Sequence, residues 1–169
     1  MIRGFHHPAI VVPDLEKARD FYERMFGFKV HHKKSWNVSD TTYNQIVGLD
    51  RSSVRGYLMQ GQNCYLELYE YATPPSAEDP KKLGANDYGI RHLGFEVDDV
   101  RKEWRRLKEL GGIHMNEPGV LDPDGGGAVY CRDPFGNIIE LTNAGESTGY
   151  YPSVTEFQAG AERHGAHRE

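Results

Sequence analysis

Two histidines and two glutamates of this 169-residue chain have the types and settings of metal ligands. Glu67 and Glu140 each stand between two aliphatic residues, in Leu-Glu-Leu and Ile-Glu-Leu segments that are typical of strands. A carboxylate in the middle of such a strand is costly to bury unless it is paired or bound to a metal. With His7 and His92 these carboxylates would form a two-histidine, two-carboxylate site. Imidazole and carboxylate donors suit a borderline or hard divalent ion, so we expect one Zn, Ni, Fe, Mn or Co ion.

Strand alternation is expected to turn all four side chains toward one cleft. Successive side chains of a strand point to opposite faces, and the large apolar residues of each first strand have the parity of a helix-covered face. His7 and His92 have the other parity, whereas His6 is out of register and is the alternative to His7. The aliphatic neighbours of Glu67 and Glu140 belong against helices, which directs both carboxylates away from them. Each residue alone is an ordinary strand residue, so the metal interpretation depends on the four matching positions.

The two halves of the chain repeat one pattern at an offset of 85 residues. Residues 7–15, HPAIVVPDL, align without a gap with residues 92–100, HLGFEVDDV. Histidine, small residue, large apolar residue, valine, aspartate and aliphatic residue coincide in order, and Gly27 falls on Gly112. A duplicated supersecondary unit explains this agreement of type, order and helix length.

Each half is expected to consist of a strand, a helix and further strands. Asp14 caps a helix whose apolar residues recur at helical spacing from Leu15 to Phe26, and Gly27 stops it. A second helix is expected after Asp98-Asp99, with its apolar face running from Val100 to Leu110. A loop occupies the stretch between this helix and residue 128, and residues 41–49 are ambiguous. The expected strands cover residues 5–12, 28–36, 54–59, 64–71, 91–97, 128–132 and 138–142. The expected organisation is a first βαβββ module at 1–71, a linker or active-site loop at 72–89, a second βαβββ module at 90–142 and a polar tail at 143–169.

Composition excludes several classes of protein. Twenty lysines and arginines against 25 aspartates and glutamates give a formal net charge of −5, which lacks the basic footprint of nucleic-acid binding. No apolar run approaches the roughly 18 residues of a membrane span. Two cysteines and no visible secretory signal indicate a cytoplasmic protein.

Four segments of the chain resemble parts of a known family: HPAIVVPDLEKARDFYERMFGFKV, YLELYEY, RHLGFEVDDV and YCRDPFGNIIEL. They are similar to the vicinal oxygen chelate superfamily, which includes glyoxalase I, extradiol dioxygenases and the fosfomycin and bleomycin resistance proteins. The resemblance covers residues 5–142 and implies an α+β fold, in which two paired βαβββ modules form a cupped mixed sheet around a metal-binding cleft. It also implies metal ligands at His7, Glu67, His92 and Glu140, a small-molecule substrate and a homodimer.

Two departures from glyoxalase I bear on the substrate. That enzyme has an arginine four residues after its first ligand and an asparagine four residues after its second, where this sequence has Val11 and Tyr71. The resemblance therefore implies a substrate other than a glutathione adduct.

Aromatic residues near the expected ligands could line a substrate pocket. Tyr65 and Tyr69 share the parity of Glu67, and Tyr130 lies on a neighbouring predicted strand. The alternative is that tyrosine is simply a good strand residue. His31 and His32, next to two lysines, are interpreted as a solvated basic edge, with the lining of the cleft mouth as the alternative.

The leading functional hypothesis is a metal-dependent, glyoxalase-like lyase or isomerase. It would transfer a proton next to a metal-chelated carbonyl of a small oxygenated substrate, with Glu67 or Glu140 as the base. The first alternative is an Fe(II) or Mn(II) extradiol-type ring-cleaving dioxygenase that uses His7, His92 and Glu140 as its metal triad. A second alternative is a resistance-type protein that sequesters a small molecule without turnover.

Overall fold

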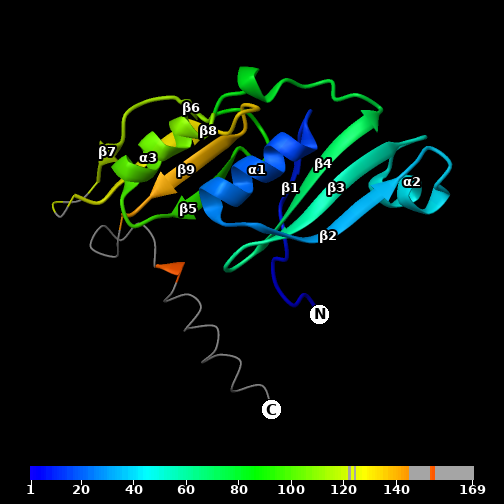
Figure 1. The fold of residues 1–169 in the computed structure, drawn as a ribbon, viewed down its shortest axis with the longest axis horizontal. Coiled ribbons are helices and arrows are strands. Elements are labelled where there is room, and N and C mark those ends of the chain that lie inside the picture. The colour runs from blue at the N-terminus through cyan, green and yellow to red at the C-terminus, as the bar shows by residue number, and fades with distance from the viewer. Residues whose placement is uncertain (122, 124, 145–152, 155–169) are drawn as a thin grey trace, which may run out of the picture. The chain divides into compact units, whose positions relative to one another are not determined.

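The computed structural model describes residues 1–121, 123, 125–144 and 153–154. The chain divides into two compact units, Met1–Lys82 and Leu83–Glu169, and the described part of each contains a sheet and at least one helix (Figure 1). The expected α+β fold is confirmed. None of the helices in the described ranges is long and apolar enough to cross a bilayer. Most of the predicted 143–169 tail lies outside the described residues.

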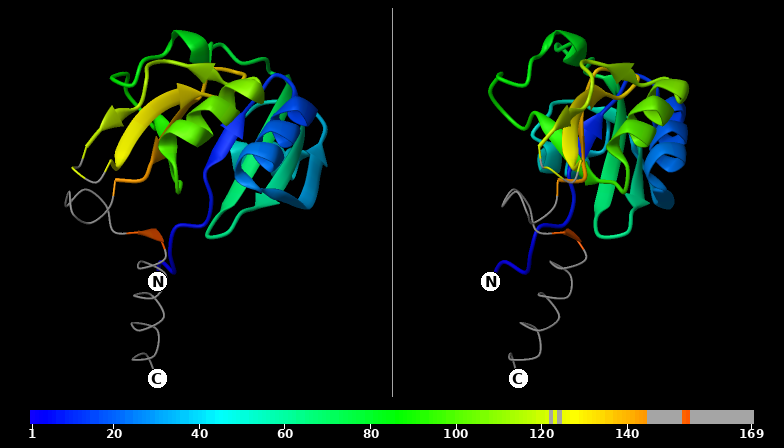
Figure 2. Two further views of the ribbon diagram at one scale, coloured as in Figure 1. Left: turned by 60° about the vertical axis from the view of Figure 1, so that its left-hand side comes forward. Right: turned by 90° about the vertical axis from the view of Figure 1, so that its left-hand side faces the viewer.

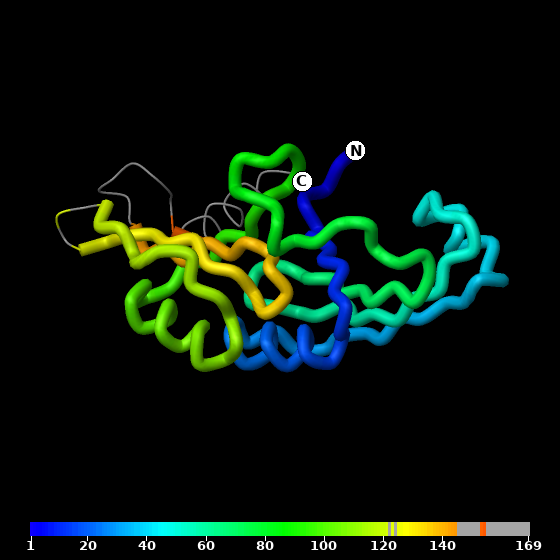
Figure 3. Tube along the Cα trace, turned by 90° about the horizontal axis from the view of Figure 1, so that it is seen from above, coloured from blue at the N-terminus to red at the C-terminus, as the bar shows by residue number. Residues whose placement is uncertain are grey.

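The first unit is a mixed four-stranded sheet with α1 along one face (Figures 2 and 3). Its elements are β1 (Ala9–Val11), α1 (Leu15–Phe26), β2 (Lys29–Trp36), α2 (Thr41–Val47), β3 (Ser53–Gln60), β4 (Tyr65–Thr73) and the 3₁₀ helix η1 (Pro80–Lys82). The strand order is β1-β4-β3-β2, and β1 runs parallel to β4. Apart from the short α2, β1 to β4 with α1 form the predicted βαβββ module.

The second unit has a sheet of the same type, and α3 packs on β8 and β9. Its elements are β5 (His92–Glu96), α3 (Val100–Glu109), β6 (Ile113–His114), β7 (Gly119–Val120), β8 (Gly127–Arg132) and β9 (Ile138–Thr142). The order is β5-β9-β8-β6, with β7 also paired to β8. The prediction of a plain loop between α3 and β8 is wrong, because β6 and β7 are two-residue strands too short to show alternation.

The parallel strand pairs repeat the sequence offset. Ala9 lies opposite Glu67 in the β1–β4 pair, and Gly94 lies opposite Glu140 in the β5–β9 pair. Ala9 and Gly94 are 85 residues apart, like the two candidate histidines. The duplication seen in the sequence therefore extends to the register that positions both glutamates.

The first strand is shorter than predicted, since β1 begins only at Ala9 instead of Phe5. Pro8 has no N–H group to donate to a ladder, although its carbonyl oxygen accepts a hydrogen bond from Glu67 N at 3.0 Å. His7 consequently lies just before the strand and is held next to β4 by that neighbouring bond.

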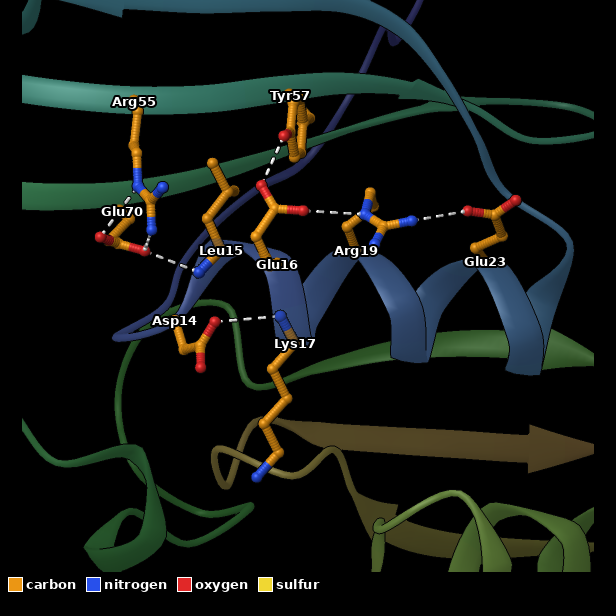
Figure 4. Close-up of polar contacts among 9 residues, drawn as sticks. All are labelled: Asp14, Leu15, Glu16, Lys17, Arg19, Glu23, Arg55, Tyr57 and Glu70. Atoms are coloured by element: carbon orange, nitrogen blue, oxygen red, sulfur yellow. Dashed lines mark hydrogen bonds and ion pairs between the residues drawn. The ribbon is translucent and has the colours of Figure 1, made fainter.

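The start of α1 is fixed by two carboxylates (Figure 4). Asp14 caps the helix by accepting a hydrogen bond from Lys17 N at 3.0 Å. Glu70 of β4 accepts from Leu15 N at 2.7 Å and from the Arg55 guanidinium at 3.0 and 2.8 Å. These bonds satisfy N–H groups that a helix leaves free at its first turn, and they tie α1 to β3 and β4.

Substitution of Glu70 by glutamine is expected to make stability less sensitive to acid. The Arg55 guanidinium lowers the pKa of the Glu70 carboxyl. Burial acts to raise this pKa, and the hydrogen bond from Leu15 N acts to lower it. Because the folded pKa is below the unfolded one, this stabilisation is complete above the unfolded pKa and is lost as the pH falls through the folded pKa. We expect Glu70→Gln to lower the free energy of unfolding by about 1 kcal/mol at pH 7 and by little in acid.

Urea unfolding between pH 7 and pH 2.5 measures this difference. Glu117→Gln, at an exposed loop position, serves as the matched control and should follow the wild type. A gap between Glu70→Gln and the wild type that stays constant over the whole range would contradict the assignment.

Candidate metal centre

In the first unit, His7 and Glu67 form a close pair. The distance from His7 Nε2 to Glu67 Oε2 is 3.1 Å. Glu67 is 6% exposed, and its neighbours Leu66 and Leu68 are completely buried on the opposite face of β4. The alternation of β4 thus brings the carboxylate to the imidazole and the two leucines into the core.

In the second unit, His92 and Glu140 repeat this arrangement. The distance from His92 Nε2 to Glu140 Oε2 is 3.3 Å, and Glu140 is also 6% exposed. Its neighbours Ile139 and Leu141 are completely buried. The predicted faces of β4 and β9 are therefore confirmed within each unit.

His6, the alternative ligand to His7, lies between His7 and Tyr65 and contacts both. Its Nδ1 lies 2.6 Å from Nδ1 of His7, and its ring stacks on Tyr65 with 5.1 Å between centroids. When His7 donates its Nδ1 proton to His6, Nε2 presents its lone pair toward Glu67, an arrangement that favours a cation between the two atoms. A hydrogen bond to the second ring nitrogen is the usual way in which a metal-binding histidine is oriented.

The donor atoms of each pair have the spacing of ligands on one ion. Donors bound at about 2.1 Å are about 3.0 Å apart at a right angle and about 3.4 Å apart at the tetrahedral angle. The separations of 3.1 and 3.3 Å lie in this range. Within the described ranges, no group of three or more His, Cys, Asp or Glu residues is arranged to hold a metal ion. Each unit therefore supplies two suitable donors.

Lys34 is a residue of this site that the sequence analysis missed. Its Nζ forms an ion pair with Glu67 Oε1 and lies 3.4 Å from the Tyr69 hydroxyl. Burial acts to raise the pKa of Glu67, but Lys34 and Tyr69 outweigh it and hold that pKa below its usual value. The hydrogen bond to Glu67 raises the pKa of Lys34. The structure thus favours the ionised form of both groups.

A β-bulge explains why Lys34 escaped prediction. Val30 pairs with Met59, whereas His32 pairs with Leu58, so the register shifts between Val30 and His32. Simple alternation from Val30 would place Lys34 on the α1 face; the bulge reverses the parity and places it opposite. His31 and His32 are exposed, and the His31 ring lies 5.6 Å from that of Tyr65, so the basic edge and the lining of the cleft mouth both stay predictions.

The three predicted pocket tyrosines lie next to the His–Glu pairs. Tyr65 stacks with His6, Tyr69 lies near Lys34, and the ring of Tyr130 is 5.0 Å from that of His92. Their contact with a substrate remains a prediction.

Glycine at position 56 creates the space for Tyr69. A Cβ atom there would lie 2.4 Å from Tyr69 Cδ1 and 2.7 Å from the backbone oxygen of Leu68. The Tyr69 ring therefore lies over β3, where it meets Trp36 at 5.7 Å edge to face. Tyr71 packs against the same indole at 6.3 Å. Aromatic rings thus continue the face that carries Lys34 and Glu67.

Comparison with known proteins gives a consistent result for most of the chain. The sequence profile of the Glyoxalase/Bleomycin resistance protein/Dioxygenase superfamily matches residues 4–141. A 2-epi-5-epi-valiolone epimerase from Actinomyces is 28% identical over 145 residues, covering 82% of this chain and 78% of the relative. A probable lactoylglutathione lyase from Vibrio cholerae is 29% identical over 136 residues, covering 80% and 86%.

Solved structures share the fold. A glyoxalase family protein from Bacillus cereus superposes with a TM-score of 0.75 at 23% identity, covering 84% of this chain and 94% of that protein. A fosfomycin resistance protein FosX variant from Listeria monocytogenes, solved with Mn(II), gives a TM-score of 0.55 at 20% identity and covers 89% and 100%. At these identities the likeness concerns the fold.

Proposed function

Because the chain belongs to the glyoxalase/bleomycin resistance protein/dioxygenase superfamily, we propose that it is a divalent-metal-dependent lyase or isomerase. The proposed reaction transfers a proton at the carbon next to a carbonyl of a small oxygenated substrate. His7, Glu67, His92 and Glu140 would together hold one divalent ion. Such an ion, when bound, supplies a Lewis acid that stabilises negative charge on a substrate oxygen.

The observation that carries the proposal is the repetition of one His–Glu pair at the same register in both units. A single pair of this kind is commonly a hydrogen bond with no further role. Two pairs at equivalent positions of a duplicated module, each with its carboxylate 6% exposed, are better explained by a shared ligand. Buried carboxylates are retained where they are paired or bound to metal.

The carboxylates are the groups suited to move the proton. A base for this reaction needs an ionised oxygen within hydrogen-bond reach of the carbon-bound hydrogen. Glu67 meets the first requirement, since Lys34 and Tyr69 hold its pKa below the usual value despite burial. Glu140 provides a second carboxylate, which a two-base epimerisation would use to return a proton to the face opposite the one from which Glu67 removes it.

Two residues near the His–Glu pairs narrow the class of substrate. Val11, at the position of the glyoxalase I arginine, is 46% exposed and brings no charge to hold a glutathione carboxylate. Tyr71, at the asparagine position, packs against Trp36. Relatives of both kinds are similar to this chain, a 2-epi-5-epi-valiolone epimerase and a lactoylglutathione lyase. The residues at positions 11 and 71 therefore decide our choice, which is a small hydroxy-carbonyl compound in place of a glutathione adduct.

Deuterium exchange in D2O tests the proposed reaction. Purified protein would be stripped of metal, reloaded separately with Zn, Ni, Co, Mn or Fe(II), and incubated with 2-epi-5-epi-valiolone or with lactoylglutathione. We expect the reloaded protein to incorporate deuterium next to the carbonyl of the cyclic ketone, and the stripped protein to lose this activity. Full turnover by the stripped protein would overturn the proposal.

The same preparations separate the alternatives. A ring-cleaving dioxygenase would consume oxygen with a catechol, show no exchange and retain its metal in Glu67→Ala, whereas the four-ligand enzyme should lose metal and activity in that variant. A sequestering protein would bind a small molecule tightly without exchange or metal. The homodimer and the cytoplasmic location stay predictions.

A further inference from the structure

Lys34 is placed on the glutamate face of the first sheet by a specific backbone device. The bulge between Val30 and His32 reverses the parity of β2, and Lys34 pairs across Gly56. Its neighbour Lys33 points to the other face, where its Nζ lies 5.8 Å from the centre of the Tyr57 ring. Two adjacent lysines of one strand therefore lie on opposite faces of the sheet, and Lys33 is the more exposed of the two.

The two oxygens of Glu67 have different partners. Oε1 is ion-paired with Lys34 Nζ, and Oε2 lies 3.1 Å from His7 Nε2. We propose that Lys34 is a positioning residue that engages Oε1 and leaves only Oε2 to join His7 as a metal donor. This inference rests on the proposed function, because it assumes that His7 and Glu67 contribute to one metal site.

No such restraint is found in the part of the second unit that the structure describes. Glu140 pairs with His92, and among the described residues it has no lysine or arginine ion-pair partner. A cation next to a carboxylate competes with a metal ion for the same negative charge, and the competition is strong where the carboxylate is buried. Glu67 is consequently the weaker and more exchangeable of the two carboxylate ligands. Lys34 sets that difference between the two His–Glu pairs.

Titration of the metal-stripped full-length protein with Co(II) tests the role of Lys34 without any substrate. Lys34→Met removes the competing charge and frees Oε1, so Co(II) should bind about tenfold more tightly than in the wild type. Lys33→Met removes the same charge from the opposite face and should change the affinity less than twofold. Lys34→Arg keeps a cation at the position and should restore wild-type affinity.

A double variant checks that Lys34 acts through Glu67. In a Glu67→Gln background, where the amide oxygen is a weaker donor and Co(II) is titrated to higher concentrations, Lys34→Met should produce less than half of the tightening it produces alone, since the ion pair is already absent. The visible absorption of bound Co(II) should change in Lys34→Met and stay unchanged in Lys33→Met. If circular dichroism shows that Lys34→Met is unfolded, Lys34→Gln replaces it with the same expectation.

The outcomes separate the two proposals. Wild-type protein that binds Co(II) while Lys34→Met and Lys34→Gln bind it equally well or more weakly overturns the role of Lys34 and leaves the proposed function standing. Wild-type protein that binds no Co(II) overturns the metal site itself, and the role of Lys34 with it.

Discussion

Replacing His92 with alanine is expected to remove metal binding and reduce proton exchange to the level of the stripped protein. His92 Nε2 faces Glu140 Oε2 at 3.3 Å, and alanine leaves the second unit with one donor. Loss of an outer-shell partner typically costs about 10- to 100-fold in metal affinity. Loss of a ligand itself should cost more than this, and activity should fall with the bound metal.

Isothermal titration of the stripped variant measures the affinity, and deuterium exchange measures the activity. His32→Ala is the control, because His32 is an exposed histidine on the Lys34 face of β2 that has no contact to either His–Glu pair among the described residues. Metal affinity and exchange within twofold of the wild type in His92→Ala would exclude His92 as a ligand.

The second large effect is expected at Asp133, in the turn that leads into β9. Asp133 is completely buried, and its Oδ1 accepts hydrogen bonds from the backbone N–H groups of Phe135, Gly136 and Asn137 at 2.8 to 2.9 Å. Its Oδ2 accepts from the Asn137 side-chain amide at 2.8 Å. Alanine removes these acceptors from three backbone donors of a buried turn. We therefore expect Asp133→Ala to lower the free energy of unfolding by about 3 to 5 kcal/mol.

Urea unfolding gives the cost directly, and Asp133→Asn provides the comparison. Asparagine keeps an oxygen for the three backbone donors but loses the acceptor of the Asn137 amide, so it should cost about 1 to 2 kcal/mol. Because the turn sets the start of β9, metal affinity should fall as well in Asp133→Ala. A cost below 1 kcal/mol for the alanine variant would show that the turn is held by other contacts.

Local chemistry made α1 predictable to the residue. Asp14 caps the helix, the helix spans Leu15–Phe26, and Gly27 follows with a positive φ of 74°, as the sequence predicted. Caps and stops depend on one or two side chains, and they can be recognised without tertiary structure. The faces of β4 and β9 were predictable for a similar reason. When the aliphatic neighbours of a glutamate pack into the core, strand alternation turns the glutamate to the opposite face.

Features that depend on partner strands could not be predicted in the same way. The bulge in β2 inserts one residue without a marker such as glycine or proline, and it decides the face of Lys34. The short α2 was ambiguous because it buries no residue, although Asp40 caps it and Gly48 ends it with a φ of 66°. In both cases the deciding contacts come from elsewhere in the unit.

Metal content per chain tests the central claim most directly. Elemental analysis and metal titration would be carried out on the wild type, His7→Ala and His92→Ala. They test whether binding of one ion requires donors from both units. We expect one equivalent of divalent metal per chain in the wild type and less than about a tenth of an equivalent in either variant at a metal concentration that just saturates the wild type. Two equivalents per wild-type chain, no bound metal at all, or a full equivalent retained by either variant would contradict the shared site.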